Sequence, residues 1–336
     1  VMLRLASICS NEVLLELREI LIAEGKPWKN HNFEFVKPLK AGLMHEGVDL
    51  MLGEDGTPYA IKRATADTMS VYMNELSVLH ELNRREFPYT VEIRDLFYDD
   101  TFSYASLSYA SEGDLFTWCN SAPQQAPERE AAMRPLALQI CSAVKWMHEA
   151  GISHRGITLE HVLLAPSALK GQLQVKVIGF GMSTTERFSI GDVRGKQSYK
   201  APEVHLGCRY DNFLMDNFAI GVVMFAMATR DYPWNSTKRG SCAIFDSIRL
   251  QGLQAVMSKR RHRHLSGVSL SQYISQPLMA LLEQLLSIDP NARLSLGERA
   301  GEDFGTNHSS VWDMPWASDS GSLLSEESEW RNIVAL

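Results

Sequence analysis

The residues best suited to chemistry gather in one short stretch, residues 153–164, which contains two histidines, an arginine and a glutamate. Glu160 carries the only carboxylate of this stretch, and carboxylate oxygens are the ligands that hard cations such as magnesium prefer. His161 follows it, but an imidazole nitrogen is a poor ligand for such a cation. Because adjacent residues of an extended loop tend to point in different directions, we do not expect Glu160 and His161 to form a metal site together.

Two regular elements must position this stretch. Before it, apolar residues at helical spacing predict a helix over residues 131–149 that turns one face to a core, with Leu138, Ile140, Cys141, Val144 and Met147 on that face. After it, residues 175–178 are typical of a strand. The chemically capable residues are therefore predicted to lie on a loop between a buried helix and a strand.

A second candidate pair lies earlier in the chain. Lys62 ends the strand-like run 59–62, and Glu75 comes thirteen positions later, where a helical pattern begins. The two charges could form an ion pair or stand apart on the surface, and these residues alone leave both interpretations open. The run belongs to a segment, residues 37–62, in which Asp55-Gly56 is a hairpin signal.

Taken in order, these segments resemble the eukaryotic protein kinase family. The catalytic loop of that family reads His-Arg-Asp-Leu-Lys-x-x-Asn, and residues 154–161 follow its frame. Gly42 and Gly47 match its glycine-rich loop, with Met44 in place of the middle glycine. Other similar segments are residues 59–62, 176–181, 201–203, 216–221 and 289–293. Each motif is weak alone, and their shared order and spacing carry the resemblance.

The resemblance implies a bilobal α+β fold, with a small antiparallel β-sheet lobe and a larger, mainly α-helical lobe. The small lobe would span residues 35–107, the hinge residues 108–113 and the large lobe residues 114–300. Residues 1–34 are predicted to form a helical extension, because apolar residues recur at helical spacing over residues 5–24. Residues 301–336 form an acidic tail that contains tryptophans.

The resemblance also implies that the catalytic chemistry is missing. Gly156 stands where kinases have the aspartate that accepts the substrate hydroxyl proton, and His161 and Gly179 stand at the two metal-ligand positions. Loss of a general base alone costs about 10²- to 10⁴-fold in rate. We therefore expect a pseudokinase with negligible turnover, no bound metal and no required cofactor.

A remnant of a nucleotide pocket is implied as well. Its residues would be Lys62, Glu75, Leu107, Tyr109, Asp114 and Leu163. Metal-dependent ATP binding is expected to be absent or very weak, because both metal ligands and the middle loop glycine are replaced. Binding of a nucleotide without metal stays open.

Residues that support the fold in active kinases are retained. Those matching the apolar stack that joins the lobes are His154, Phe180, Leu79 and Ile93. Those matching the braces of the large lobe are Asp216, Glu203 and Arg293. Their retention predicts that the frame persists where the chemistry does not.

Arg155 is retained beside the missing base. In kinases this arginine often binds a phosphorylated residue of the activation segment, and the alternative is a structural hydrogen bond to the backbone of that segment. The hydroxyls available for phosphorylation are Ser183, Thr184, Thr185, Ser189, Ser198 and Tyr199.

Composition limits the partners. The 336 residues include 33 basic and 40 acidic side chains, a formal charge of −7, which disfavours nucleic-acid binding through phosphate neutralisation. No apolar run approaches the ~20 residues that span a bilayer, so we expect no membrane span. The five cysteines show no zinc-ligand spacing. A cytoplasmic location is favoured, with a removed secretory signal as the open alternative.

Two functions remain open on the sequence. The first is a signalling scaffold or allosteric regulator that contacts a protein partner, such as an active kinase. The second is an active nucleotide-dependent transferase with relocated catalytic residues, which would need new acidic residues near residues 153–164 or 179–181; apart from Glu160 we find none. The candidate contact surfaces are the N-terminal helix, the basic run 259–264 and the acidic tail.

Overall fold

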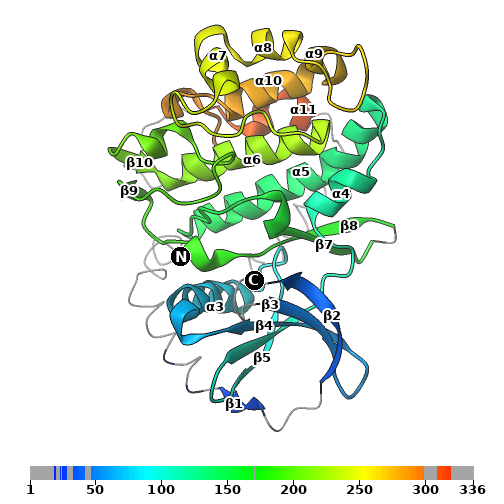
Figure 1. Ribbon diagram of the computed structural model, residues 1–336, viewed down its shortest axis with the longest axis vertical. Coiled ribbons are helices and arrows are strands. Elements are labelled where there is room, and N and C mark those ends of the chain that lie inside the picture. Colours follow the sequence, from blue (N-terminus) through cyan, green and yellow to red (C-terminus); the bar gives the residue numbers. More distant parts are fainter. Residues whose placement is uncertain are drawn as a thin grey trace. The chain divides into compact units, whose positions relative to one another are not determined.

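The computed structural model describes residues 19, 23, 25–28, 33–41, 47–169, 171–298 and 309–318. The chain divides into two compact units, and Figure 1 labels most of their helices and strands. Unit 1 comprises residues 1–114, 150–154 and 161–185, and unit 2 comprises residues 115–149, 155–160 and 186–336. The predicted helix over residues 5–24, the loop residues Gly42 and Met44, and the tail segments 301–308 and 319–336 lie outside the described residues, apart from positions 19 and 23.

Unit 1 is built on a six-stranded sheet in the order β1-β5-β6-β4-β3-β2. Its strands are β1 (Lys26–Pro27), β2 (Glu34–Ala41), β3 (Gly47–Leu52), β4 (Pro58–Ala64), β5 (Ile93–Tyr98) and β6 (Ser103–Ser108). Neighbouring strands are antiparallel except β1 beside β5. The predicted hairpin joins β3 to β4: Gly56 takes a φ of 76°, which suits glycine, and the Asp55 carboxylate accepts hydrogen bonds from Thr57.

Helix α3 (Met69–Arg84) packs within this unit. It buries apolar side chains at helical spacing, namely Tyr72, Met73, Leu76, Leu79 and Leu82. Near its end, the Asn83 amide donates to the carbonyl of Val91 at 2.9 Å and accepts from the N–H of Ile93 at 2.8 Å. These two bonds fix the end of α3 to the start of β5.

A two-stranded hairpin completes unit 1. Strands β7 (Val162–Pro166) and β8 (Leu173–Val177) are antiparallel. The N–H of Leu164 donates to the carbonyl of Gly113, and the N–H of Glu112 donates to the carbonyl of Leu164. These bonds join the hairpin to residues 112–113 of the same unit.

Unit 2 is mainly helical (Figure 1). Its helices are α4 (Leu115–Ser121), α5 (Ala126–Glu149), α6 (Asn212–Thr229), α7 (Ala243–Gln251), α8 (Leu253–Lys259), α9 (Leu270–Tyr273), α10 (Gln276–Leu285) and α11 (Pro315–Ser318), with the short strand pair β9 (Phe188–Ile190) and β10 (Arg209–Asp211). Helix α5 contains the predicted 131–149 helix and begins five residues earlier. An α+β fold with an N-terminal sheet and a helical region is confirmed.

Helix α6 forms the centre of unit 2. Its length and hydropathy would suit a membrane span, but all of its residues are buried within the protein, which is typical of a core helix. A side chain at Gly221 would begin 2.8 Å from Leu286, so this glycine allows the close approach of the chain that follows α10.

The described part of the tail packs onto unit 2. The side chain of Trp316 is fully buried and donates to the Glu130 carboxylate at 2.8 Å. Trp312 donates to the carbonyl of Leu296 at 2.7 Å. Residues 309–318 are thus part of the folded unit, and Trp330 lies outside the described residues.

Candidate functional site

The two positions that the resemblance assigns to metal ligands lie against each other in unit 1. Gly179 has a φ of 83°, in the left-handed region that favours glycine. A side chain at Gly179 would begin 2.8 Å from Cδ2 and 2.9 Å from Cγ of the His161 ring. The N–H of Ile178 donates to the carbonyl of His161, which holds the two strands in this register. The imidazole therefore fills the space that a side chain at position 179 would need.

These residues do not fit a magnesium ion. Magnesium requires oxygen ligands in near-octahedral geometry, whereas position 179 has no side chain and position 161 supplies an imidazole. Within the ranges that the structure describes, no three metal-ligating side chains gather at any site. We therefore derive no step through a metal.

The Lys62–Glu75 ion pair is present in unit 1. Lys62 lies on β4, opposite Ala105 of β6, and Glu75 lies on α3. The ammonium of Lys62 lies 2.6 Å from Oε2 of Glu75, and the Glu75 side chain is mostly buried. Of the two interpretations left open by the sequence, the ion pair is confirmed.

A second contact joins α3 to residues 180–183. The side-chain amide of Asn74 donates to the carbonyls of Phe180, Gly181 and Ser183, at 3.2, 3.3 and 3.1 Å. A side chain at Gly181 would begin 2.5 Å from Val71, so a glycine is needed for this approach. We refer to this contact as the Asn74 clamp. No signal in the sequence singled out Asn74.

The other residues assigned to a nucleotide pocket also belong to unit 1. Leu107 is buried on β6 and pairs with Ala60 of β4. Asp114 forms a backbone bridge with Leu163, which brings the end of the hinge beside β7. Tyr109 directly follows β6 in the chain, and its side chain is half-buried. The residues assigned to a nucleotide pocket thus all lie in unit 1, and binding of a nucleotide by them stays a prediction.

His154 and Phe180 keep the contact expected of the apolar stack. Their ring centroids are 5.2 Å apart, and Nε2 of His154 lies 3.0 Å from the carbonyl oxygen of Ile178. Phe180 and Leu79 are buried, whereas Ile93 is half-buried on β5.

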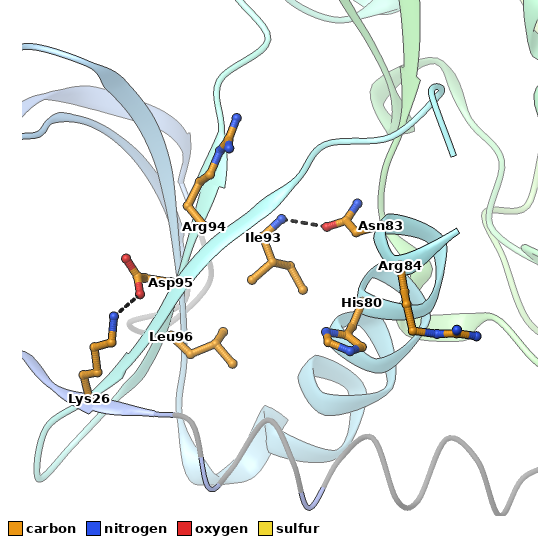
Figure 2. A pocket seen from close by; sticks show the side chains of 8 residues that line it. All are labelled: Lys26, His80, Asn83, Arg84, Ile93, Arg94, Asp95 and Leu96. Atoms are coloured by element: carbon orange, nitrogen blue, oxygen red, sulfur yellow. Dashed lines mark hydrogen bonds and ion pairs between the residues drawn. The ribbon is translucent and has the colours of Figure 1, made fainter. Parts of the chain in front are cut away.

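Unit 1 also carries a hollow away from these residues. It has a volume of about 520 Å³ and is lined by α3, β5 and β1, with the side chains shown in Figure 2. Lys26 is bound to Asp95, and Arg94 lies 2.7 Å from Glu92. Because most of the basic side chains at this hollow have an acidic partner, it carries no strong excess charge.

In unit 2, Asp216 braces the loop at Arg155. Arg155 has a φ of 62°, uncommon for a residue with a side chain. Its N–H donates to Oδ1 of Asp216 at 2.7 Å, and Oδ2 of Asp216 lies 3.1 Å from Nε2 of His148. The Glu203 carboxylate binds Arg293 at 2.6 and 2.9 Å. Both braces predicted from the resemblance are confirmed.

His148 is fully buried between two carboxylates. Its Nδ1 lies 3.8 Å from Glu298, which the sequence did not indicate. Burial lowers the pKa of His148, but the contacts with Asp216 and Glu298 outweigh burial and raise that pKa to about 9. Burial raises the pKa of Glu298, but its contacts with His148 outweigh burial and lower that pKa to about 2.

The side chain of Arg155 binds a carboxylate of its own chain. Its guanidinium contacts Asp192, which also accepts a hydrogen bond from Arg194 at 2.8 Å. Burial raises the pKa of Asp192, but these two guanidinium groups lower it overall. Neither interpretation drawn from the sequence included Asp192, although its acidic side chain between residues 179 and 201 was a visible signal.

Several of the six candidate hydroxyls are already engaged. Ser183 is buried and donates to the carbonyl of His154, and Tyr199 is buried against Tyr232. Ser189 accepts a hydrogen bond from Asn212 at 2.8 Å. Phosphorylation at these three positions would have to break existing contacts.

Glu160 is held by the segment that follows. Its carboxylate lies 2.8 Å from the ammonium of Lys196. Burial raises the pKa of Glu160, but the hydrogen bond from Lys196 outweighs it, so the pKa is lowered. Oε1 of the only carboxylate in residues 153–164 is therefore held in an ion pair.

The similarity to known proteins agrees with this geometry. Residues 42–304 match the family model of the protein kinase domain, so the chain belongs to the protein kinase domain family. Among its relatives is serine/threonine-protein kinase SBK1 of Mus musculus, 26% identical over 78% of this chain and 60% of the relative. The SBK1 protein of Danio rerio is 24% identical over 87% of this chain and 73% of the relative.

Protein kinase C-like 2 of Schizosaccharomyces pombe is 26% identical over 82% of this chain, which is 25% of that relative. The chain thus spans about a quarter to three quarters of the length of these three relatives. It is a kinase-domain protein related to serine/threonine kinases.

Proposed function

We propose that this protein is a pseudokinase that acts as a scaffold or allosteric regulator through protein contacts, with no or negligible phosphotransferase activity. The observation that carries the proposal is the packing of the His161 ring into the side-chain space of Gly179. Kinases use magnesium to neutralise charge between the transferred phosphates. In this chain a glycine and an imidazole occupy the two ligand positions and pack against each other. This packing supports the loss of magnesium binding.

The contacts that remain favour a fixed frame. Lys62–Glu75 and the Asn74 clamp hold α3 from two directions within unit 1. In unit 2, Asp192 supplies to Arg155 a carboxylate that is present without any modification. A shape held in this way suits a protein that is read by a partner, and an active kinase is one partner class to test.

The alternative is a transferase with relocated catalytic residues. It would need a free carboxylate near Gly156, and the carboxylate of Glu160 is bound to Lys196. We therefore favour the pseudokinase.

A phosphate-transfer assay on the whole chain tests the proposal. We expect no labelled phosphate on the chain or on generic serine/threonine substrates, whereas active kinases turn over at about 1–100 s⁻¹. Transfer by the native chain that is lost in Lys62→Met would establish the transferase instead.

A further inference from the structure

The hollow between α3, β5 and β1 in unit 1 has an apolar inner wall. Its volume is about 520 Å³. Figure 2 shows Ile93 and Leu96 of β5 directed toward His80 of α3, and all three side chains are half-buried. Because apolar surface gains stability when it is removed from water, this wall favours an apolar occupant.

The chain itself runs along the rim of this hollow. Lys26 of β1 pairs with Phe97 of β5, and its ammonium binds Asp95. Lys26 also lines the hollow. The segment that comes just before it, residues 5–24, is therefore attached at the rim.

This segment has one apolar face. Leu14, Leu17 and Leu21 recur in it at helical spacing, but they lie outside the described residues. Two of its positions are described, Glu19 and Ala23, and both are helical and exposed. In a helix with 3.6 residues per turn, these two residues share one face and the three leucines fall on the opposite face. Since an exposed apolar stripe is a liability, the leucine face is expected to be covered.

The length of the segment matches the hollow. A helix rises about 1.5 Å per residue, so Leu21 and Leu14 would lie about 5 and 15 Å from a helix end at Glu24. Strand β5 has six residues, which extend over about 20 Å. All three leucines thus fall within the length of the strand that walls the hollow.

Another exposed apolar surface of unit 1 lies too far away. It is formed on β2 by Phe35, Val36 and Leu39, at the opposite edge of the sheet from β1. Five strand spacings of about 4.8 Å separate the two edges, about 24 Å in all. The five residue steps from Leu21 to Lys26 span at most about 18 Å, so Leu21 does not reach β2.

We propose that residues 5–24 form an amphipathic helix that packs its leucine face into the hollow between α3 and β5. The helix is an intramolecular ligand of unit 1. Together with the two bonds of Asn83, it holds the end of α3 on β5. It also covers this surface against protein partners, and it does so whether or not the protein transfers phosphate.

Hydrogen exchange of the full chain tests the proposal with a matched pair of variants. Leu21→Asp places a charge on the packed face, and Ala23→Asp places the same charge on the exposed face two residues away. We expect the amides of β5 and of residues 76–84 to exchange at least about tenfold faster in Leu21→Asp, because an unpaired charge cannot occupy the apolar hollow. Ala23→Asp should keep the native rates. Native rates in Leu21→Asp, or equal acceleration in both variants, would overturn the proposal.

A double-mutant cycle shows which surface the leucine face covers. The combined variant Leu14→Ala, Leu17→Ala and Leu21→Ala should be non-additive with Leu96→Ala in urea unfolding, because residues in contact couple. It should be additive with Leu39→Ala on β2. Additivity with Leu96→Ala would overturn the proposal.

The protein concentration separates the intramolecular helix from one supplied by a second copy. We expect the exchange rates of β5 to be unchanged by dilution, and light scattering to give the mass of one chain. Protection of β5 that falls on dilution would assign the hollow to a second copy and would likewise overturn the proposal.

Discussion

The ring of His161 lies where a side chain at Gly179 would begin, 2.8 Å from the position of its first carbon. The two residues that stand at the metal-ligand positions therefore pack directly against each other. Restoring an aspartate at position 179 alone would press it against the imidazole, so a return to metal binding needs changes at both positions.

We predict that Gly179→Asp destabilises the protein by about 2–4 kcal/mol, from left-handed backbone strain together with overpacking. Adding His161→Asn should recover part of that loss. The measurement is urea unfolding of the two single variants and the double variant. Gly151→Asp is the matched control, since Gly151 has a φ of 78° and no atom within 4 Å of an added Cβ. Equal losses at positions 151 and 179, with strictly additive effects of His161→Asn, would argue against the coupling.

The Asn74 clamp gives a second prediction. Asn74→Asp keeps the shape of the side chain but replaces its donor by an acceptor facing three carbonyls. We expect a loss of about 1–3 kcal/mol and faster amide hydrogen exchange at residues 180–184. Asn120→Asp, at an exposed helical amide that donates to one carbonyl, serves as the control. Unchanged exchange in residues 180–184 would mean that the clamp does not hold this segment.

Asp192→Asn should remove the carboxylate from Arg155 and Arg194. Arg155 is buried, but the Asp192 side chain is 35% exposed, so solvent screening limits the expected loss to about 1–2 kcal/mol. Proteolysis within residues 186–200 should become faster. Phosphatase treatment of the native protein should change neither its stability nor the rate of this proteolysis. A change in either after phosphatase treatment would instead support a phosphorylated segment.

The sequence predicted the parts of the site that depend on order along the chain. The strand with Lys62 and the helix with Glu75 follow from local pattern, and the braces at Asp216 and Arg293 follow from the resemblance to protein kinases. Asn74, Asp192 and Glu298 were missed because their partners lie on other elements, at 106, 37 and 150 positions along the chain.

The basic run 259–264 also makes contacts that the sequence did not predict. Arg260 donates to the carboxylate of Asp231 and to the carbonyls of Tyr232 and Pro233, and His262 is buried. Charge alone suggested a docking surface, whereas these contacts give Arg260 a structural role. Charge reversal intended to test partner binding should therefore be confined to exposed Lys259 and Arg263.

Burial of His148 between two carboxylates predicts a pH-dependent stability. Its pKa is raised to about 9 in the folded protein from an ordinary value of about 6.5. The stabilisation is therefore complete below about pH 6.5 and is lost as the pH rises through about 9, with a slope of up to about 1.4 kcal/mol per pH unit. Glu298 contributes with the opposite pH dependence, because its pKa is lowered in the folded protein. The stabilisation by Glu298 is lost as the pH falls through about 2.

Urea unfolding from pH 6 to pH 9.5 measures the contribution of His148. In His148→Gln the slope over this range should be smaller than in the native protein. Parallel profiles of the two proteins would show that His148 does not carry its proton in the folded state.

The most direct test of the pseudokinase proposal is a thermal-shift titration of the native chain with ATP, with and without magnesium. We predict that magnesium adds no stabilisation at any ATP concentration, whether or not ATP alone binds beside Lys62. The double variant His161→Asn with Gly179→Asp is the comparison in which a magnesium effect can return. A magnesium-dependent rise in the unfolding temperature of the native chain at sub-millimolar ATP would contradict the proposal.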